Sequence, residues 1–151
     1  MIEKLNNKDS KMAIKIRSVF QASYAVEAKL LKAIDFPPLK RPLESYVKSD
    51  NDFLGYLKNE ELAAVIEIDQ INNQTHIQSL VVHPKFFRQG IARKLMEFIL
   101  NSYNSNIFMV ETGVDNGPAS ILYKKLGFKE VKQWDTKIGI RKIRFERKIS
   151  S

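Results

Sequence analysis

The feature that most constrains the fold is a strand, a helix and a second strand that follow one another mid-chain. Residues Thr75 to Val82 read as a strand that ends at Pro84, because proline cannot donate to a sheet ladder. Gly90 precedes an amphipathic helix whose apolar face contains Ile91, Leu95, Phe98 and Ile99. The run from Ile107 to Val110 is apolar throughout, which is typical of a strand buried on both faces. This unit predicts two parallel strands joined by a right-handed crossover.

Other short apolar runs predict antiparallel strands on either side of this unit. Phe53 to Lys58 and Leu62 to Asp69 are separated by Asn59-Glu60, a turn pair that favours a hairpin. Asn72-Asn73 marks the next turn, so the strand from Thr75 would complete a three-stranded meander. Two further runs predict a closing hairpin: Phe128 to Trp134 and Ile138 to Lys148.

Three helical segments accompany these strands. The stretch from Ser10 to Ile34 is helical in pattern, as one helix or as two that meet near Ser23-Tyr24. A short helical turn is expected from Pro42 to Val47. Asn116-Gly-Pro118 has the N-cap and first-turn proline of a helix start, and Gly127 occupies the place of a left-handed C-cap.

The length of 151 residues suits one domain, which we expect to be α/β: a mixed, mainly antiparallel sheet with one parallel βαβ step and flanking helices. Within it, residues 1–50 are expected to be helical and residues 53–148 to hold the sheet. The chain has no cysteine, which excludes disulfides, thiolate zinc sites and cysteine nucleophiles. With two histidines, no metal site is expected.

The charge balance suggests an anionic partner. Lys and Arg number 25 against 17 Asp and Glu, a formal net charge of +8. Such a surplus suits nucleic acid, a membrane surface or a phosphorylated small molecule, and charge alone does not choose among them. The N-terminal segment carries charges throughout and has no apolar core, so a secretory signal is not expected. No run approaches the ~18 apolar residues of a membrane span. We therefore expect a cytoplasmic protein without a membrane partner.

The turn from Phe87 to Ala92 is a candidate anion site. The unpaired amides and the dipole of a helix N-terminus bind anions, and Gly90 permits close approach to the backbone. Arg88 and Arg93 add positive charge. The turn has neither the Gly-Lys-Ser/Thr of a Walker loop nor the three glycines of a dinucleotide fingerprint. Phosphate binding and an ordinary strand-to-helix turn both remain open on these residues alone.

Four motifs in this order resemble the GNAT superfamily of acyl-CoA N-acyltransferases, over a stretch from about Phe53 to the C-terminus. They are Leu80-Val-Val-His-Pro, Arg88-Gln-Gly-Ile-Ala, Asn116-Gly-Pro-Ala and Leu122-Tyr-Lys-Lys-Leu-Gly-Phe. The cofactor motif of the family runs Gln/Arg-x-x-Gly-x-Gly/Ala. Gly90 and Ala92 match it, whereas Phe87 stands at its first position.

The resemblance implies a V-shaped opening between the strands around Leu80–Val82 and Ile107–Val110, with acetyl-CoA as cosubstrate. The pantetheine would pair with the backbone of Leu80 and Val82, and the diphosphate would lie on the amides of Arg88 to Arg93. Asn116 would contact the cofactor, cap its helix, or do both. The implied cofactor-binding residues are Leu80, Val81, Val82, Arg88, Gln89, Gly90, Ile91, Ala92, Arg93, Asn116 and Tyr123.

The resemblance also implies direct acetyl transfer from the thioester to an amine. A backbone N–H of Leu80 or Val81 would stabilise the oxyanion, and Tyr123 would protonate the leaving thiolate. On the pattern alone Tyr123 is equally a core aromatic, because it shares a helical face with Leu122 and Leu126.

The general base is expected to be Glu67 or His76, unless the protein has no dedicated base. Glu67 lies on the more polar face of its strand. His76 is expected to share a face with Gln78 and Leu80, and an imidazole titrates near neutral pH. His83, at the end of its strand, is the less favoured alternative.

The function expected from these residues is an acetyl-CoA-dependent N-acetyltransferase that acts through a ternary complex on a primary amine of a small molecule or peptide. The alternatives are a non-catalytic CoA-binding module and a basic nucleic-acid-binding protein. No RNA-binding motif accompanies the basic final strand, which disfavours the second. The N-terminal region would select the acceptor, with Tyr24, Glu27, Phe36 and Glu44 as pocket candidates. The sequence does not decide between a monomer and a homodimer, and only analogy with similar folds suggests dimerisation through the C-terminal strands.

Overall fold

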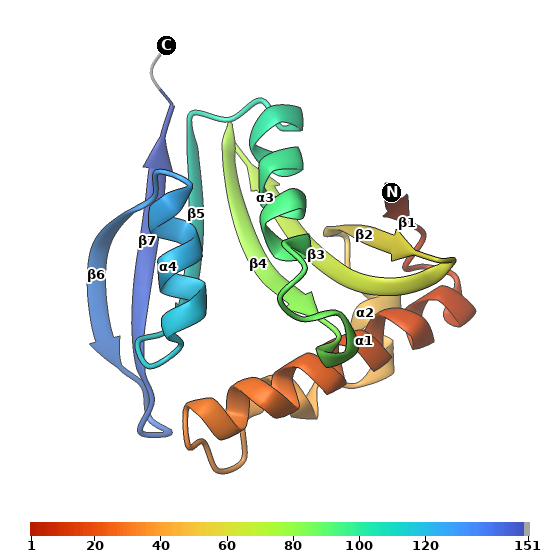
Figure 1. The fold of residues 1–151 in the computed structure, drawn as a ribbon, viewed down its shortest axis with the longest axis horizontal. Coiled ribbons are helices and arrows are strands. Elements are labelled where there is room, and N and C mark those ends of the chain that lie inside the picture. Colours follow the sequence, from red (N-terminus) through yellow and green to blue (C-terminus); the bar gives the residue numbers. More distant parts are fainter. Residues whose placement is uncertain (150–151) are drawn as a thin grey trace.

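In the computed structural model, which describes residues 1–149, the chain forms a seven-stranded sheet with strand order β1-β2-β3-β4-β5-β7-β6 (Figure 1). The strands are β1 (Ile2–Leu5), β2 (Asp52–Lys58), β3 (Glu61–Ile71), β4 (Gln74–Val82), β5 (Ile107–Gly113), β6 (Lys129–Asp135) and β7 (Arg141–Lys148). The helices are α1 (Ser10–Leu30), α2 (Leu43–Lys48), α3 (Ile91–Ser102) and α4 (Gly117–Lys125), with 3₁₀ turns η1 (Pro37–Lys40) and η2 (Pro84–Phe86).

The predicted fold class is confirmed. Strands β4 and β5 pair in parallel around α3, and every other neighbouring pair in the described sheet is antiparallel. The turn pairs Asn59-Glu60 and Asn72-Asn73 all have positive φ, the geometry that two-residue hairpin turns require. The βαβ unit and the meander therefore form where the sequence predicts them.

Two local features were left undetermined by the sequence. Strand β1 was not predicted, because a four-residue edge strand with charges at Glu3 and Lys4 has no apolar run. It pairs with β2 at the edge of the sheet. The segment from Ser10 is one continuous helix to Leu30 and not two, and its N-cap Asp9 accepts a hydrogen bond from the amide of Met12 at 3.3 Å.

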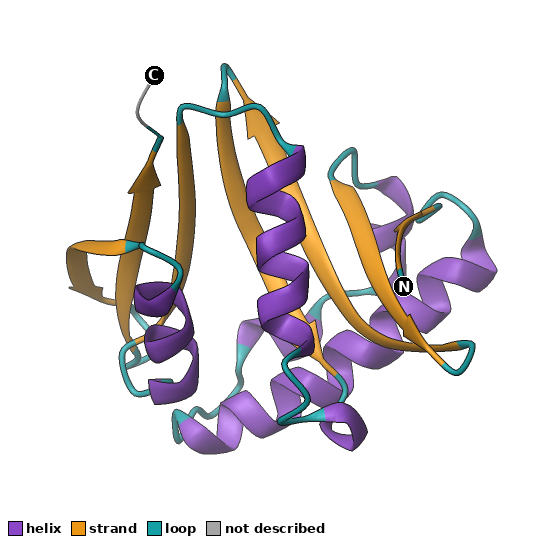
Figure 2. Ribbon diagram, turned by 45° about the horizontal axis from the view of Figure 1, so that its top comes forward, coloured by secondary structure: helices purple, strands orange, loops and turns teal. Residues whose placement is uncertain are grey.

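Helices cover both faces of the sheet, as Figure 2 shows. Because side chains alternate along a strand, Ala64 and Ile66 of β3 pack in the core under α3 and α4, whereas Val65 packs in the core under α1 and α2. A third cluster joins Ala28 of α1 to Ile140, just before β7. Helix α1 therefore contacts both halves of the sheet.

A β-bulge in β4 changes which face its first residues occupy. Glu67 of β3 lies opposite Ser79, but the next residue, Ile68, lies opposite Ile77, so Gln78 is the extra residue. Each residue of β4 before the bulge consequently lies on the face opposite to the one that uninterrupted alternation would give it. The expectation that His76 shares a face with Leu80 is therefore wrong: His76 lies opposite Asp69, on the face that Glu67 and Ser79 occupy.

The sheet opens in the same region, because β4 and β5 separate there. Parallel pairing of β4 with β5 runs from Gln74↔Ile107 to Ile77↔Val110 and then stops. Figure 1 shows the two strands diverging toward the end where α1 crosses. The predicted V-shaped opening exists, but it lies between Ser79–Val82 and the last residues of β5, Glu111–Gly113. The segment Ile107–Val110, which was expected to border it, is paired.

Candidate functional site

The main chain of β4 presents donors to this opening. The amide of His83 donates to Ala63 of β3 at 2.9 Å, and successive N–H groups of a strand point in opposite directions. The amides of Val81 and His83 therefore face β3, and those of Leu80 and Val82 face away from it. Accordingly, the amide of Val82 donates a hydrogen bond to the hydroxyl of Ser23 on α1 at 3.3 Å. Of the two residues expected to supply an oxyanion donor, Leu80 has its N–H on the open side and Val81 does not.

An outer groove of about 480 Å³ runs from this opening to the start of α3. Its apolar walls include Val26, Leu30 and Phe87, which are 40%, 46% and 39% exposed, respectively. The residues of the predicted cofactor set that line it are Leu80, Val82, Arg88, Gly90, Ile91, Ala92 and Asn116. The groove offers an apolar path that ends at a helix N-terminus.

The first turn of α3 has unpaired amides. The N-cap Gly90 has φ of 72°, and the amide of Lys94 donates to its carbonyl at 3.1 Å. The amides of Ile91, Ala92 and Arg93 consequently precede the first intrahelical donor. A Cβ built on Gly90 meets nothing within 4 Å, so the backbone is open to the groove. This turn can bind an anion through its main chain without the Gln or Arg that Phe87 replaces.

Not all predicted cofactor side chains point into the groove. Val81 is 1% exposed and packs under α1. The side chain of Gln89 is hydrogen-bonded to Lys58, and Arg93 pairs with Glu97 at 2.9 Å. Neither Gln89 nor Arg93 lines the groove.

An inner cavity of about 270 Å³ lies on the other side of the opening. It is lined by Tyr24, Glu27, Leu31, Phe36, Pro38, Arg41, Ile77, Gln78, Ser79, Leu80, Val110, Glu111, Thr112, Gly113, Asn116, Ala119, Tyr123 and Lys142. Glu27, Leu80 and Asn116 line the groove as well. The two spaces therefore meet at these three residues, where a molecule in the groove and a molecule in the inner cavity could touch.

Tyr123 of α4 is both a core residue and a cavity residue. It is 4% exposed and packs at an angle against Phe128 and Phe145. Burial raises the pKa of its phenol far above the ordinary value, and the nearby charge of Glu27 adds to this effect. Tyr123 therefore keeps its proton at neutral pH and can donate it at the cavity wall.

Asn116 connects α4 to α1. Its Oδ1 accepts from the amide of Ala119 at 3.3 Å and so caps α4, as predicted. Its Nδ2 donates to Oε1 of Glu27 at 3.0 Å. The hydrogen bond between Asn116 and Glu27 spans the opening at the junction of the two cavities.

Glu67, one of the two expected bases, is held in an ion pair. Its carboxylate accepts from Nη1 and Nη2 of Arg41 at 2.7 and 3.0 Å, and also from Asn51 and Ser79. Its side chain is 3% exposed, and it lines neither the groove nor the inner cavity. The structure therefore places Glu67 in a buried network with both carboxylate oxygens occupied.

His76, the other expected base, also lines neither space. It lies opposite Met109 of β5, near Glu111 and Arg144. Burial lowers the pKa of its imidazole, with the charge of Glu111 opposing that effect. His76 lies in the stretch where β4 is still paired with β5, before the two strands separate.

Two carboxylates do line the inner cavity. Glu27 was among the expected pocket residues, together with Tyr24 and Phe36, whereas Glu44 lies on α2 in an ion pair with Lys48. Glu111 was not singled out, although a charged residue that directly follows a buried apolar strand is a signal of a site at the strand end. Its carboxylate lies 3.6 Å from Arg144.

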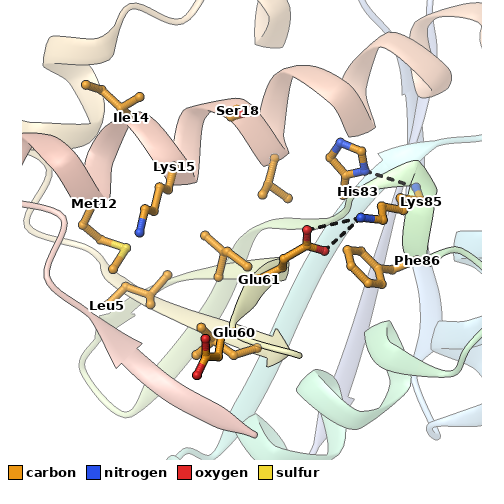
Figure 3. Close-up of a pocket in the computed structure, with 13 residues that line it drawn as sticks. Leu5, Met12, Ile14, Lys15, Ser18, Glu60, Glu61, His83, Lys85 and Phe86 are labelled. Carbon is orange, nitrogen blue, oxygen red and sulfur yellow. Dashed lines mark hydrogen bonds and ion pairs between the residues drawn. The ribbon is translucent and has the colours of Figure 1, made fainter.

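A larger cavity of about 540 Å³ lies apart from this site, between α1 and the β2–β3 hairpin (Figure 3). Its walls are mostly apolar, and Lys85 and Glu61 form an ion pair of 3.0 Å at one side. His83 also lines this cavity, and its Nδ1 accepts a hydrogen bond from the amide of Lys85. Phe86 lines both this cavity and the groove. Of the predicted catalytic residues, Tyr123, Glu67, His76 and Leu80 do not line this cavity, whereas His83, the less favoured candidate for the base, does.

Residues 1–149 contain no cluster of three or more His, Cys, Asp or Glu side chains that could hold a metal ion. Nor is any helix within the described range long and apolar enough to cross a membrane.

The chain resembles a known protein family and several known proteins in sequence. A family model for the acetyltransferase (GNAT) domain matches residues 22–149. The chain is similar to UPF0157 protein YqkA of Bacillus subtilis, with 33% identity over 132 residues that cover 86% of this chain and 38% of that protein. It is also similar to an N-alpha-acetyltransferase of Saccharolobus solfataricus, with 32% identity over 90 residues, or 55% of this chain and 54% of that protein. The chain thus spans about two fifths to about half of the length of these curated relatives.

Solved structures share the fold. The ribosomal-protein-S18-alanine N-acetyltransferase from Escherichia coli superposes with a TM-score of 0.79 at 19% identity, over 100% of this chain and 94% of that one. The PaiA N-acetyltransferase from Thermoplasma acidophilum, in complex with coenzyme A, superposes with a TM-score of 0.74 at 20% identity, over 99% and 98%. At these identities the likeness shows the fold alone.

Proposed function

This chain belongs to the GNAT acetyltransferase domain family, and from that premise we propose that it transfers an acetyl group from acetyl-CoA to a primary amine of a small molecule or peptide. The transfer is direct, through a ternary complex. The sequence contains no cysteine that could hold an acyl intermediate.

The observation that carries the proposal is the junction of the groove and the inner cavity at the N–H of Leu80. Acetyl-CoA occupies the groove, with its pantetheine along β4 and its diphosphate on the amides that begin α3. The thioester then lies at the junction, and an amine in the inner cavity approaches it from the other side. Two substrates that meet at one point need no covalent enzyme intermediate.

The reaction assigns roles to Leu80 at the junction and to Tyr123 in the wall of the inner cavity. The neutral amine attacks the thioester carbonyl, and the N–H of Leu80 stabilises the oxyanion. The carbon–nitrogen bond forms, the carbon–sulfur bond breaks, and the phenol of Tyr123 protonates the departing thiolate. The phenol of Tyr123 is protonated at neutral pH and so has a proton to donate, although burial, which raises its pKa, makes it a weaker acid than an exposed tyrosine.

The comparisons support the choice of substrates. The PaiA structure with the same fold is a complex with coenzyme A, and an N-alpha-acetyltransferase is among the curated relatives. We further propose that residues 1–50 form the acceptor side of the domain and residues 53–148 the cofactor side, since Tyr24, Glu27, Phe36 and Arg41 all line the inner cavity.

Titration calorimetry with acetyl-CoA tests the proposal, in the parent protein and in Gly90→Asp. The carboxylate of Gly90→Asp would stand in the open space above the amides of α3 and repel the diphosphate, so we expect affinity to fall at least tenfold, about 1.4 kcal/mol. Gly139→Asp is the matched control, because Gly139 also has positive φ and open surroundings but lies between β6 and β7. A parent protein that does not bind acetyl-CoA would refute the proposal.

A further inference from the structure

A carboxylate lies where the groove and the inner cavity meet. Of the three residues common to both spaces, Leu80 contributes its main chain, Asn116 an amide, and Glu27 an ionisable side chain. Glu27 projects from α1, the helix that crosses the open end of the sheet (Figure 1). Its hydrogen bond to Asn116 of α4 fixes the carboxylate across the junction rather than toward solvent.

We propose that Glu27 is the general base of the acetyl transfer, the group that accepts the proton lost by the acceptor amine. The inference rests on the proposed function and identifies a residue for a step that neither Glu67 nor His76 is placed to perform. An amine is protonated near neutral pH and cannot attack until it loses that proton. The carboxylate of Glu27 binds the ammonium and takes one proton before the neutral amine attacks. The nitrogen loses its second proton after the carbon–nitrogen bond forms, and this proton restores the phenol of Tyr123, which has protonated the thiolate. Glu27 releases its proton to solvent after the product leaves.

The surroundings of Glu27 suit this role. Burial raises the pKa of its carboxyl, while the hydrogen bond from Asn116, the charge of Lys142 and the hydroxyl of Thr112 lower it. A raised pKa makes the carboxylate a stronger base than an exposed glutamate. Its charge interacts with Tyr24 of α1, Tyr123 of α4 and Lys142 of β7, and the other ionisable residues that line the same cavity are Arg41 and Glu111.

The other acidic candidates are less well placed. Glu111 lines the inner cavity but not the groove, and it lies 3.6 Å from Arg144. Glu67 accepts two hydrogen bonds from Arg41 and lines neither space. Glu27 borders both the groove proposed for the thioester and the cavity proposed for the amine.

The test compares Glu27→Gln with the parent, using Glu130→Gln on exposed β6 as the matched control. Thiol release from acetyl-CoA is followed with three probes: an alanine-initiated hexapeptide, an Nα-blocked lysine amide and tyramine. We expect kcat of Glu27→Gln to fall by about 10²- to 10⁴-fold, the usual contribution of a general base. Acetyl-CoA affinity should stay within about twofold of the parent, and Glu27→Asp should recover part of the rate.

The pH profile separates a base from a residue that only positions Asn116. The kcat/KM of the parent should fall as the pH decreases through the pKa of Glu27, because the protonated carboxyl cannot accept a proton. In Glu27→Gln this acid limb should disappear.

A Glu27→Gln variant that keeps its kcat within about threefold, or that keeps the acid limb, overturns the assignment while leaving acetyl transfer intact. A parent protein that binds acetyl-CoA but acetylates none of the probes overturns the catalytic role, and one that binds no acetyl-CoA overturns the proposed function itself.

Discussion

Tyr123 is both part of the packed core and part of the wall of the candidate site. Its ring packs with Phe128 and Phe145 in the core under α4, and it also lines the inner cavity. The helical spacing in the sequence was compatible with either role, because an aromatic on an apolar face gives the same pattern in both cases. The structure places the ring in both settings, and burial raises the pKa of the phenol.

Replacement of Tyr123 by Phe should preserve the ring packing and remove the proton donor. We expect kcat to fall by about 10²-fold or more, with acetyl-CoA affinity within about twofold of the parent. Because the pKa of Tyr123 lies above its ordinary value of about 10, deprotonation of the phenol should not reduce the rate of the parent below about pH 10. Rates measured between pH 6 and about pH 10 with thiol detection test both points. An unchanged kcat would favour a protein that binds CoA without turnover.

At the scale of elements, Arg41 attaches the segment between η1 and α2 to the sheet. It forms a bidentate ion pair with Glu67 of β3, and its guanidinium lies 4.1 Å from the ring centre of Tyr46 on α2. Asn51 and Ser79 complete the hydrogen bonding of the carboxylate. This network positions one wall of the inner cavity, which Arg41 itself lines.

Arg41→Met should destabilise the fold, because it leaves the carboxylate of Glu67 buried without its cation. Loss of one partner of a buried pair costs about 3–5 kcal/mol, and we expect the lower end because the Arg41 side chain retains 23% exposure. The double variant Arg41→Met/Glu67→Met should recover part of that loss, since it buries no unpaired charge. Urea unfolding of the three proteins measures the differences. A single-variant loss below about 1 kcal/mol would contradict the structural role given to this pair.

The elements that sequence analysis predicted correctly are those whose signal is local. Apolar periodicity and turn residues such as Asn72-Asn73 define β2 to β5 and α3, because each pattern depends on neighbours a few residues away. The bulge at Gln78 has no such signal, yet it moves His76 to the opposite face. The pairing of Arg41 with Glu67 depends on tertiary structure, since the two residues are 26 positions apart in the sequence. For this reason the candidate anion-binding turn at Gly90 could be predicted from a motif, whereas the positions of Glu67 and His76 could not.

At the scale of the whole molecule, the opening divides the sheet into two parts. Strands β1 to β4 form one part and β5 to β7 the other, joined by the short parallel pairing from Gln74 to Ile77. Helix α1 bridges them at the open end, where Ala28 contacts Phe36 and Ile140. A ligand in the groove touches Leu80 and Ile91 of the first part and Asn116 and Pro118 beside the second, so its binding should hold the two parts together.

Acetyl-CoA should therefore raise the thermal stability of the parent protein. At a concentration one hundred times Kd, linkage gives about 2.7 kcal/mol, which corresponds to a rise in Tm of roughly 5–11 °C for a chain of this size. Differential scanning fluorimetry measures the shift without any need for turnover or for a known acceptor. Gly139→Asp should show the same shift at that concentration, whereas Gly90→Asp should show a shift smaller by about half, because a tenfold loss of affinity removes about 1.4 kcal/mol. An equal shift in Gly90→Asp would mean that acetyl-CoA binds away from the start of α3, and that the diphosphate does not use the amides of that turn.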